Sequence, residues 1–206
     1  MPGRVHVVDD DASFQTAIER RLKKAGYEVV TYPSAQHFLN HMPSEGETGC
    51  ILLDVRMPGL SGPELQSYLI ELGSTLPIVF LTGYADVPTT VQTIKAGAED
   101  FLTKPVTSDE LLQAIERAMA HHEARRCLKS KLDMIRTHIA ALTPREREVF
   151  QLVVRGKTNK QIANALGCTE RTIKAHRQRV MNKMQVETLA ELVILAERIG
   201  VLNGTW

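Results

Sequence analysis

Short apolar segments alternate with amphipathic segments through the first half of this chain, and this alternation sets the strongest limit on its fold. The apolar segments occupy residues 4–8, 28–32, 50–53, 77–81 and 100–103. Each has the length of a β-strand, and the intervening segments carry apolar residues at helical spacing, as in Phe14, Ile18 and Leu22. Strand and helix alternating five times predicts an α/β fold, with a doubly wound, five-stranded parallel sheet.

The chain becomes helical after residue 109. One apolar stripe ends near Ala118, a second runs from Leu128 to Leu142, and the polar stretch 121–126 separates them. We interpret the first stripe as the last helix of the α/β domain. The second is interpreted as a linker helix with a coiled-coil-like seam, although it could instead dock on its own domain. The predicted segments are 1–122 for the α/β domain, 123–142 for a long helical linker and 143–206 for a second domain.

Residues 143–206 have the pattern of four short helices. The segments Thr143-Pro144-Arg145-Glu146 and Thr158-Asn159-Lys160-Gln161 have the spacing of a capping box at a helix start. Gly167 then predicts a helix end, and Thr169 predicts the N-cap of the next helix. A short helix, a tight turn that contains glycine and another helix predict an all-α helix-turn-helix domain.

Charge is segregated along the chain. Residues 1–122 contain 9 basic and 16 acidic residues, a balance of −7, whereas residues 123–206 contain 16 basic and 8 acidic residues, a balance of +8. An acidic half suits bound cations, and a basic half suits an anionic polymer such as DNA. No segment approaches the roughly 18 consecutive apolar residues of a membrane span. Because the N-terminus also lacks a hydrophobic signal core, we expect a cytoplasmic protein with no membrane partner.

Five polar residues are placed at the ends of predicted strands. They are Asp9, Asp10, Asp54, Thr82 and Lys104. The carboxyl ends of parallel strands meet at the edge of the sheet where such folds bind ligands, so we expect these side chains to lie together. The carboxylates suit a divalent cation such as Mg²⁺, and an aspartate can accept a phosphoryl group as a nucleophile. Taken singly, the first aspartates could be a helix cap and Lys104 a surface lysine.

Residues 4–122 resemble the receiver domain of response regulators. The matching motifs are Val7-Val8-Asp9-Asp10, the run 52–62 around Asp54, Leu81-Thr82-Gly83 and Phe101-Leu102-Thr103-Lys104-Pro105. The resemblance implies that Asp54 accepts a phosphoryl group from a sensor histidine kinase. It also implies a Mg²⁺ or Mn²⁺ cofactor, held directly by Asp10, Asp54 and the backbone carbonyl of Arg56, with Asp9 acting through water.

The same resemblance implies a conformational switch. Thr82 and Lys104 would bind the phosphoryl oxygens, and Phe101 would turn inward as Thr82 moves. The peptide bond between Lys104 and Pro105 is predicted to be cis. Tyr84 is interpreted as a surface aromatic residue. By this resemblance the protein is not a metabolic enzyme, because a receiver catalyses only its own phosphorylation and dephosphorylation.

The predicted second helix of the helix-turn-helix, residues 169–184, has one apolar face and one basic face. Its core residues at helical spacing are Ile173, Val180 and Met184. The opposite face carries no carboxylate after Glu170 and suits the major groove of DNA. The predicted contacts there are Lys174, Ala175, Gln178 and Arg179, with Arg177 and Lys183 flanking them. Asn159 and Lys160 begin the preceding helix and suit phosphates, since helix N-termini attract anions. The alternative to a DNA-binding surface is that the basic face of residues 169–184 is simply solvated.

Residues 143–202 resemble the LuxR-type helix-turn-helix. The matching runs are 142–149, 156–163, 172–176 and 183–186. A receiver followed by this domain is similar to the NarL/FixJ family, and the linker length favours its FixJ branch. The resemblance adds Thr172 to the DNA contacts. It implies a transcriptional regulator, expected to be an activator, whose partners are double-stranded DNA with two half-sites, RNA polymerase and a second copy of itself.

Two other functions compete with this interpretation. A Mg²⁺-dependent phosphohydrolase would use the same aspartyl nucleophile, but no separate substrate pocket is evident and the basic half would have no purpose. A constitutive DNA-binding protein with a vestigial receiver would leave the complete acidic set without a purpose. Within the favoured function, phosphorylation could act by dimerisation, by unmasking the DNA-binding domain, or by both.

Overall fold

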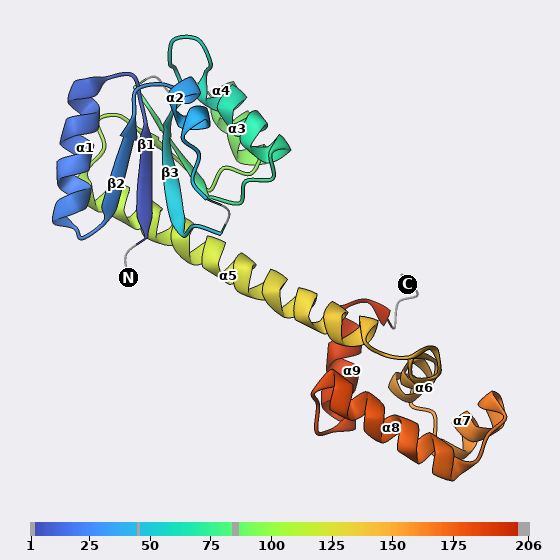
Figure 1. Ribbon diagram of the computed structural model, residues 1–206. Helices are drawn as coiled ribbons and strands as arrows, with labels where there is room; N and C mark the ends of the chain where they lie inside the picture. Colours follow the sequence, from blue (N-terminus) through green and yellow to red (C-terminus); the bar gives the residue numbers. More distant parts are fainter. Residues whose placement is uncertain (1–2, 45, 84–86, 202–206) are drawn as a thin grey trace. The chain divides into compact units, whose positions relative to one another are not determined.

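The computed structural model describes residues 3–44, 46–83 and 87–201, and Tyr84 lies outside these ranges. Internal contacts divide the chain into two units, Met1–Arg125 and Arg126–Trp206 (Figure 1). Among the described residues, no helix combines the length and the apolar character that a membrane span requires.

The first unit contains a five-stranded parallel sheet, as the sequence predicts. The strand order is β2-β1-β3-β4-β5. The strands are β1 (Arg4–Val8), β2 (Glu28–Tyr32), β3 (Gly49–Asp54), β4 (Ile78–Thr82) and β5 (Asp100–Thr103). The helices that follow them are α1 (Ala12–Lys24), α2 (Ala35–Asn40), α3 (Gly62–Glu71), α4 (Val87–Lys95) and α5 (Ser108–Ala140). This order confirms the doubly wound α/β fold.

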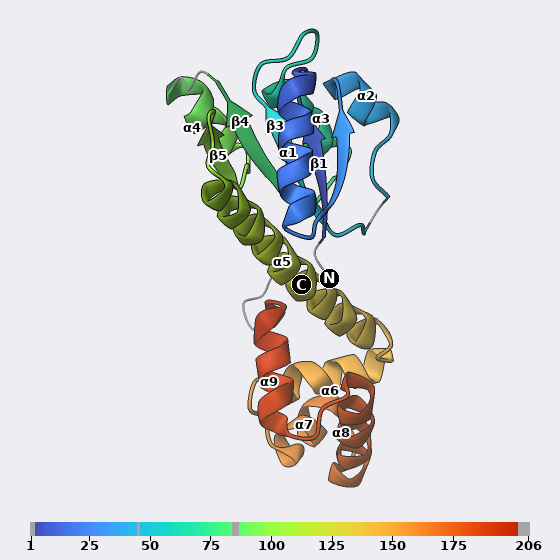
Figure 2. The same ribbon diagram turned by 90° about the vertical axis from the view of Figure 1, so that its left-hand side faces the viewer.

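Helices cover both faces of this sheet. Figures 1 and 2 show α1 and α5 on one face and α2, α3 and α4 on the other. Successive residues of a strand point to opposite faces, so Val7 packs in the cluster beneath α1 and α5, whereas Val8 packs in the cluster beneath α2 and α3. All six residues of β3 are buried, because this strand lies in the middle of the sheet.

Helix α5 corrects two expectations from the sequence. It continues through the polar stretch 121–126, where separate helices were predicted. This stretch contains neither Gly nor Pro, so it interrupts the apolar stripe without interrupting the backbone helix. We also predicted a coiled-coil-like seam along residues 128–142, and this prediction is wrong for its second half. Ile135, Ile139 and Leu142 are buried in the core of the second unit, whereas Leu128 is exposed.

The second unit contains the four predicted short helices. They are α6 (Pro144–Val154), α7 (Asn159–Leu166), α8 (Glu170–Met184) and α9 (Leu189–Arg198). Both predicted capping boxes are present, since the side chains of Thr143 and Thr158 each accept a hydrogen bond from the backbone N–H three residues later. Gly167 ends α7 in the left-handed conformation, and the predicted apolar face of α8 is buried.

Glu146 joins two of these helices through a buried carboxylate. Its Oε2 accepts hydrogen bonds from the backbone N–H of Thr143 at 2.9 Å and from Nζ of Lys183 at 2.7 Å. The side chain is only 4% exposed. The hydrogen bond from Lys183, followed by that from Thr143, lowers the pKa of Glu146 to about 2. The charged carboxylate therefore ties the start of α6 to the end of α8.

The substitution Glu146→Gln keeps an acceptor for the Thr143 N–H but removes the charge. We expect it to lower the free energy of unfolding of the second unit by about 1–3 kcal/mol at neutral pH. Because the folded-state pKa lies below the ordinary value of 4.5, this stabilisation is present above pH 4.5 and is lost as the pH falls toward 2. Calorimetry of both proteins across this range should show their difference shrinking. A difference that stays constant would contradict the assigned role of the carboxylate.

Candidate functional site

The carboxyl edge of the sheet brings the predicted site residues together. Asp9 follows β1, Asp54 ends β3, Thr82 ends β4 and Lys104 follows β5. The parallel register aligns these ends, since Asp54 pairs with Leu81 and Thr82 pairs with Thr103. The strands that carry Asp9 and Asp54 are direct neighbours in the sheet.

Three carboxylates form the centre of this edge. Asp9, Asp10 and Asp54 each offer an oxygen atom that lies within 4.8 Å of the corresponding atoms of the other two. Asp9 is buried, Asp54 is 9% exposed and Asp10 is exposed to solvent. Such closely spaced negative charges repel one another unless a cation lies among them.

Lys104 supplies one such cation. Its Nζ lies 2.5 Å from Oδ2 of Asp9 and 3.1 Å from Oδ2 of Asp54, so it bridges two of the three carboxylates. Burial raises the pKa of Asp9 above its ordinary value, and the hydrogen bond from Lys104 acts in the opposite direction. One ammonium group cannot neutralise three carboxylates, so the residues present fit a further hard cation with oxygen ligands.

The other predicted residues of this edge lie around the carboxylates. The backbone N–H of Arg56 points to Oδ1 of Asp54 at 3.4 Å. Thr82 is 1% exposed, and its backbone carbonyl accepts a hydrogen bond from the N–H of Lys104 at 2.6 Å. The peptide bond between Lys104 and Pro105 is cis, as predicted. Phe101 is half-buried, with its ring centroid 6.2 Å from that of Phe80.

Gly62 allows a close approach between the start of α3 and the end of β3. A Cβ atom at this position would lie 2.2 Å from the backbone oxygen of Asp54, which is shorter than any real contact of a Cβ atom. The N–H of Gly62 also donates to the carbonyl of Val55 at 3.1 Å. Helix α3 can therefore begin against the end of β3 only with glycine here.

Two residues near this edge were missed by the sequence reasoning. The ring of Phe14 lies under the ammonium group of Lys104, with Nζ 4.0 Å from the ring centroid. The side-chain amide of Gln15 donates to the backbone carbonyls of Asp9 and Tyr32. Phe14 was assigned only to the core stripe of its helix. One feature of the sequence does indicate this contact. Phe14 lies in the first helical turn after the acidic residues, where side chains can face the carboxyl edge of the sheet.

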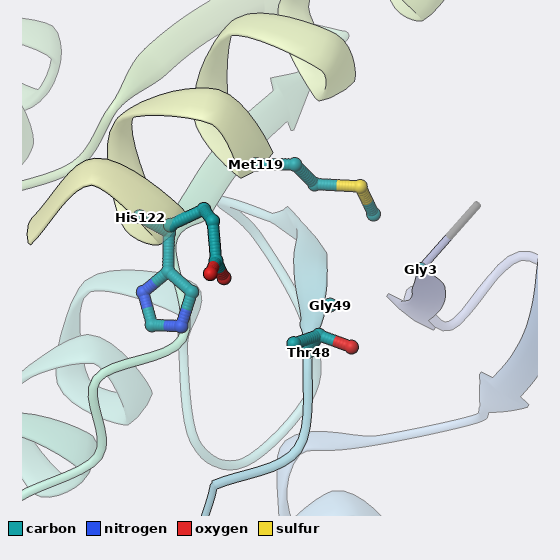
Figure 3. Close-up of a pocket in the computed structure, with 6 residues that line it drawn as sticks. Gly3, Thr48, Gly49, Met119 and His122 are labelled. Carbon is teal, nitrogen blue, oxygen red and sulfur yellow. The ribbon is translucent and has the colours of Figure 1, made fainter. Parts of the chain in front are cut away.

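The first unit also has a cavity where the strands begin, away from the acidic cluster. Its volume is about 250 Å³. The residues that line it are Gly3, Thr48, Gly49, Met119, His122 and Glu123 (Figure 3). In Figure 3, Met119 projects from α5 toward Gly3, and His122 projects from the same helix. None of the predicted site residues lines this cavity.

In the second unit, most of the predicted DNA contacts form one exposed surface on α8. Its residues are Thr172, Lys174, Ala175, Gln178 and Arg179, all of them exposed. A groove of about 460 Å³ runs along this helix, lined by Lys174, Arg177, Gln178 and Met181 together with Asn159 of α7 and Leu189 of α9. Within the described part of the chain, Oδ1 of Asn159 is buried without a hydrogen-bond partner. Lys160 is exposed in the first turn of α7.

Lys183 differs from the other predicted DNA contacts. Its Nζ donates to Oε2 of Glu146 at 2.7 Å and to the backbone carbonyl of Ala141 at 3.0 Å. Its charge is therefore used inside the second unit. The sequence placed Lys183 at the flank of the basic face, but gave no sign of a carboxylate 37 residues earlier in the chain.

Comparison with known families finds two matches. Residues 5–116 match the family described as response regulator receiver domain, and residues 140–196 match the family described as bacterial regulatory proteins, luxR family. The first match covers the whole acidic edge, and the second covers α6, α7, α8 and most of α9.

Individual proteins resemble the chain over nearly its full length. The transcriptional regulatory protein FixJ of Bradyrhizobium diazoefficiens is 41% identical over 201 residues, covering 98% of each chain. The response regulator protein TodT of Pseudomonas putida is 38% identical, covering 95% of this chain and 86% of its own. The solved structure of the response regulator StyR is 43% identical, with a TM-score of 0.87 and coverage of 96% and 100%.

The close approach at Gly62 can be tested by Gly62→Ala. The added methyl group must push β3 and α3 apart, so we expect the free energy of unfolding of the first unit to fall by about 1–3 kcal/mol. The matched control is Gly83→Ala, because a Cβ atom at Gly83 meets no atom within 4 Å. Calorimetry should show a lower transition temperature for the first variant alone. Equal transition temperatures would show that the strand end tolerates a side chain.

Proposed function

Because the chain belongs to the NarL/FixJ family of response regulators, with a receiver followed by a LuxR-type DNA-binding domain, we propose that a phosphoryl group on Asp54 controls its action on DNA. Members of this family are phosphorylation-dependent transcription regulators and not metabolic enzymes, and a receiver implies a sensor kinase as partner. The observation that carries the proposal is the position of Lys104 between the carboxylates of Asp9 and Asp54.

In the proposed reaction, a carboxylate oxygen of Asp54 attacks the phosphorus atom of a phosphohistidine on the kinase. A phosphorus–oxygen bond forms while the phosphorus–nitrogen bond breaks, and the electron pair of the broken bond returns to the histidine nitrogen. Lys104, whose Nζ lies 3.1 Å from Oδ2 of Asp54, would offset charge on the phosphoryl oxygens, and the hydroxyl of Thr82 would donate a hydrogen bond to one of them. We further propose that the receiver catalyses only the gain and loss of this group.

We propose Mg²⁺, or Mn²⁺ in its place, as the cofactor of this step. Asp10 and Asp54 would hold it directly with the carbonyl of Arg56, and Asp9 would act through water. The arrangement of the carboxylates supports this assignment, since one oxygen atom from each of the three lies within 4.8 Å of those of the other two, so all three could reach a single cation. When bound, the cation would offset negative charge on the phosphoryl group during its transfer.

The proposed switch uses the strands beside the phosphoryl site. Thr82 would move toward the phosphoryl group, and Phe101, on the neighbouring strand β5, would turn inward. The half-buried position of Phe101 beside Phe80 supports this, because the ring already lies at the edge of the core. The resulting state would favour a homodimer, unmask the DNA-binding domain, or both.

On DNA, we propose that α8 enters the major groove. Lys174 and Gln178 are suited to base edges, Ala175 to a thymine methyl group, and Thr172 and Arg179 complete the exposed face. Asn159 and Lys160 would contact the backbone from the start of α7. We also propose two half-sites for a dimer, contact with RNA polymerase and activation of transcription. The boundaries 1–122, 123–142 and 143–206 remain our proposed domain division.

The phosphorylation of Asp54 can be tested with acetyl phosphate and Mg²⁺. Mass spectrometry should show the wild-type chain gaining one phosphoryl group, and Asp54→Asn gaining none, because its side chain lacks the nucleophilic carboxylate. Asp109→Asn is the matched control, since Asp109 is an exposed aspartate in the first turn of α5. Modification of the Asp54→Asn variant at the wild-type rate, or an unmodified wild type, would refute the proposed site.

Helix α8 carries a lysine on the proposed DNA-binding face, Lys174, and a lysine that pairs with a carboxylate inside the second unit, Lys183. The substitutions Lys174→Ala and Lys183→Ala test these two roles. With duplex DNA selected from a random pool, we expect Lys174→Ala to reduce the discrimination between selected and random DNA by about 10-fold, since a base contact is lost. Lys183→Ala should lower the stability of the second unit, because it leaves Glu146 buried without its cation. If Lys183→Ala instead weakens DNA binding at unchanged stability, Lys183 belongs to the interface.

A further inference from the structure

The ammonium group of Lys104 has a third neighbour besides its two carboxylates. Its Nζ lies over the ring of Phe14, 4.0 Å from the centroid. The negative face of an aromatic ring attracts a cation within about 6 Å, and more strongly where water is excluded. We propose that Phe14 is a positioning residue, whose ring holds Lys104 at the acidic cluster in the geometry needed to meet a phosphoryl group on Asp54. This inference rests on the proposed function, because it concerns the same site.

The helical turn that carries Phe14 is held at this edge of the sheet. Asp11, the N-cap of α1, accepts a hydrogen bond from the backbone N–H of Phe14 at 3.1 Å. The side chain of Gln15 donates to the carbonyls of Asp9 at 2.5 Å and of Tyr32 at 2.8 Å. The first turn of α1 is thereby tied to the ends of β1 and β2. Phe14 also packs against the core cluster beneath α1 and α5.

An aromatic ring suits this place because of the hydrogen-bonding capacity of lysine. An ammonium group has three donors, and Asp9 and Asp54 accept two of them here. A third carboxylate or amide would take the remaining donor. The face of Phe14 attracts the charge without a strong acceptor, so one donor stays available for a phosphoryl oxygen. The ring also covers the lysine side chain, which is only 17% exposed.

Three variants distinguish the effect of the aromatic face of Phe14 from the effect of its size. Phe14→Leu and Phe14→Met keep an apolar side chain but remove the aromatic face, whereas Phe14→Tyr keeps the face. The matched control is Tyr27→Leu, because Tyr27 is another partly buried aromatic residue packed against the same core cluster, but it precedes β2 and so lies at the opposite edge of the sheet from Lys104. Calorimetry of all four establishes which are folded and how much packing each loses.

The first readout needs neither a metal nor a phosphoryl group. In the NMR spectrum of the metal-free full chain with labelled lysine, the ring should shift the ε-methylene protons of Lys104 upfield of the other lysines, and Lys104→Arg assigns the signal. We expect this shift to vanish in Phe14→Leu and Phe14→Met and to persist in Phe14→Tyr and Tyr27→Leu. An unshifted Lys104 signal in the wild type would overturn the proposal.

The second readout is the rate of phosphorylation by acetyl phosphate with Mg²⁺. Loss of the ring should slow it by about 2- to 30-fold, the range that corresponds to one cation–π contact, and Phe14→Tyr should restore it. If the wild type is phosphorylated on Asp54 and Phe14→Leu reacts equally fast, this inference fails while the proposed function stands. If the wild type is not phosphorylated on Asp54, the proposed function fails first.

Discussion

Mutual repulsion among three carboxylates is the constraint on which the receiver unit depends. Asp9, Asp10 and Asp54 gather because parallel strands end at one edge, and burial makes the charge of Asp9 costly. Lys104 offsets part of that charge and bridges two of the three groups. The cluster therefore retains negative charge that a divalent cation can balance. This need for a further cation is what links the fold of the receiver unit to the proposed role of Asp54.

A charged pair also organises the second unit. Glu146 is buried at the start of α6 and holds Lys183 near the end of α8, so the helix that carries the proposed DNA contacts is fixed at one end by an ion pair and along its length by the apolar core. This arrangement leaves the opposite face of α8 exposed, with Lys174 and Gln178 projecting from it. In both units, a lysine forms an ion pair with a buried carboxylate: Lys104 with Asp9 in the first, and Lys183 with Glu146 in the second. Each ion pair holds together the segments that carry the neighbouring proposed site.

Local features were predictable from the sequence, and contacts between distant segments were not. Asp54 could be placed at a strand end and Thr143 at a helix start because strand length and capping chemistry operate over a few residues. The sequence does not predict the continuity of α5 through 121–126, because the polar residues there interrupt the apolar stripe that would indicate a single helix. The partner of Lys183 and the ring of Phe14 under Lys104 were missed because each contact joins segments that only the fold brings together.

We propose that the state of the acidic edge controls the action of the chain on DNA, and dimerisation is one route by which this control would operate. Sedimentation equilibrium of the full chain measures dimerisation, with and without Mg²⁺ and beryllium fluoride, which stands in for the phosphoryl group on Asp54. We predict a shift from monomer to dimer in the wild type only when both are present, and no shift in Asp54→Ala. A wild type that stays monomeric, or an equal shift in Asp54→Ala, would contradict control of assembly by this site.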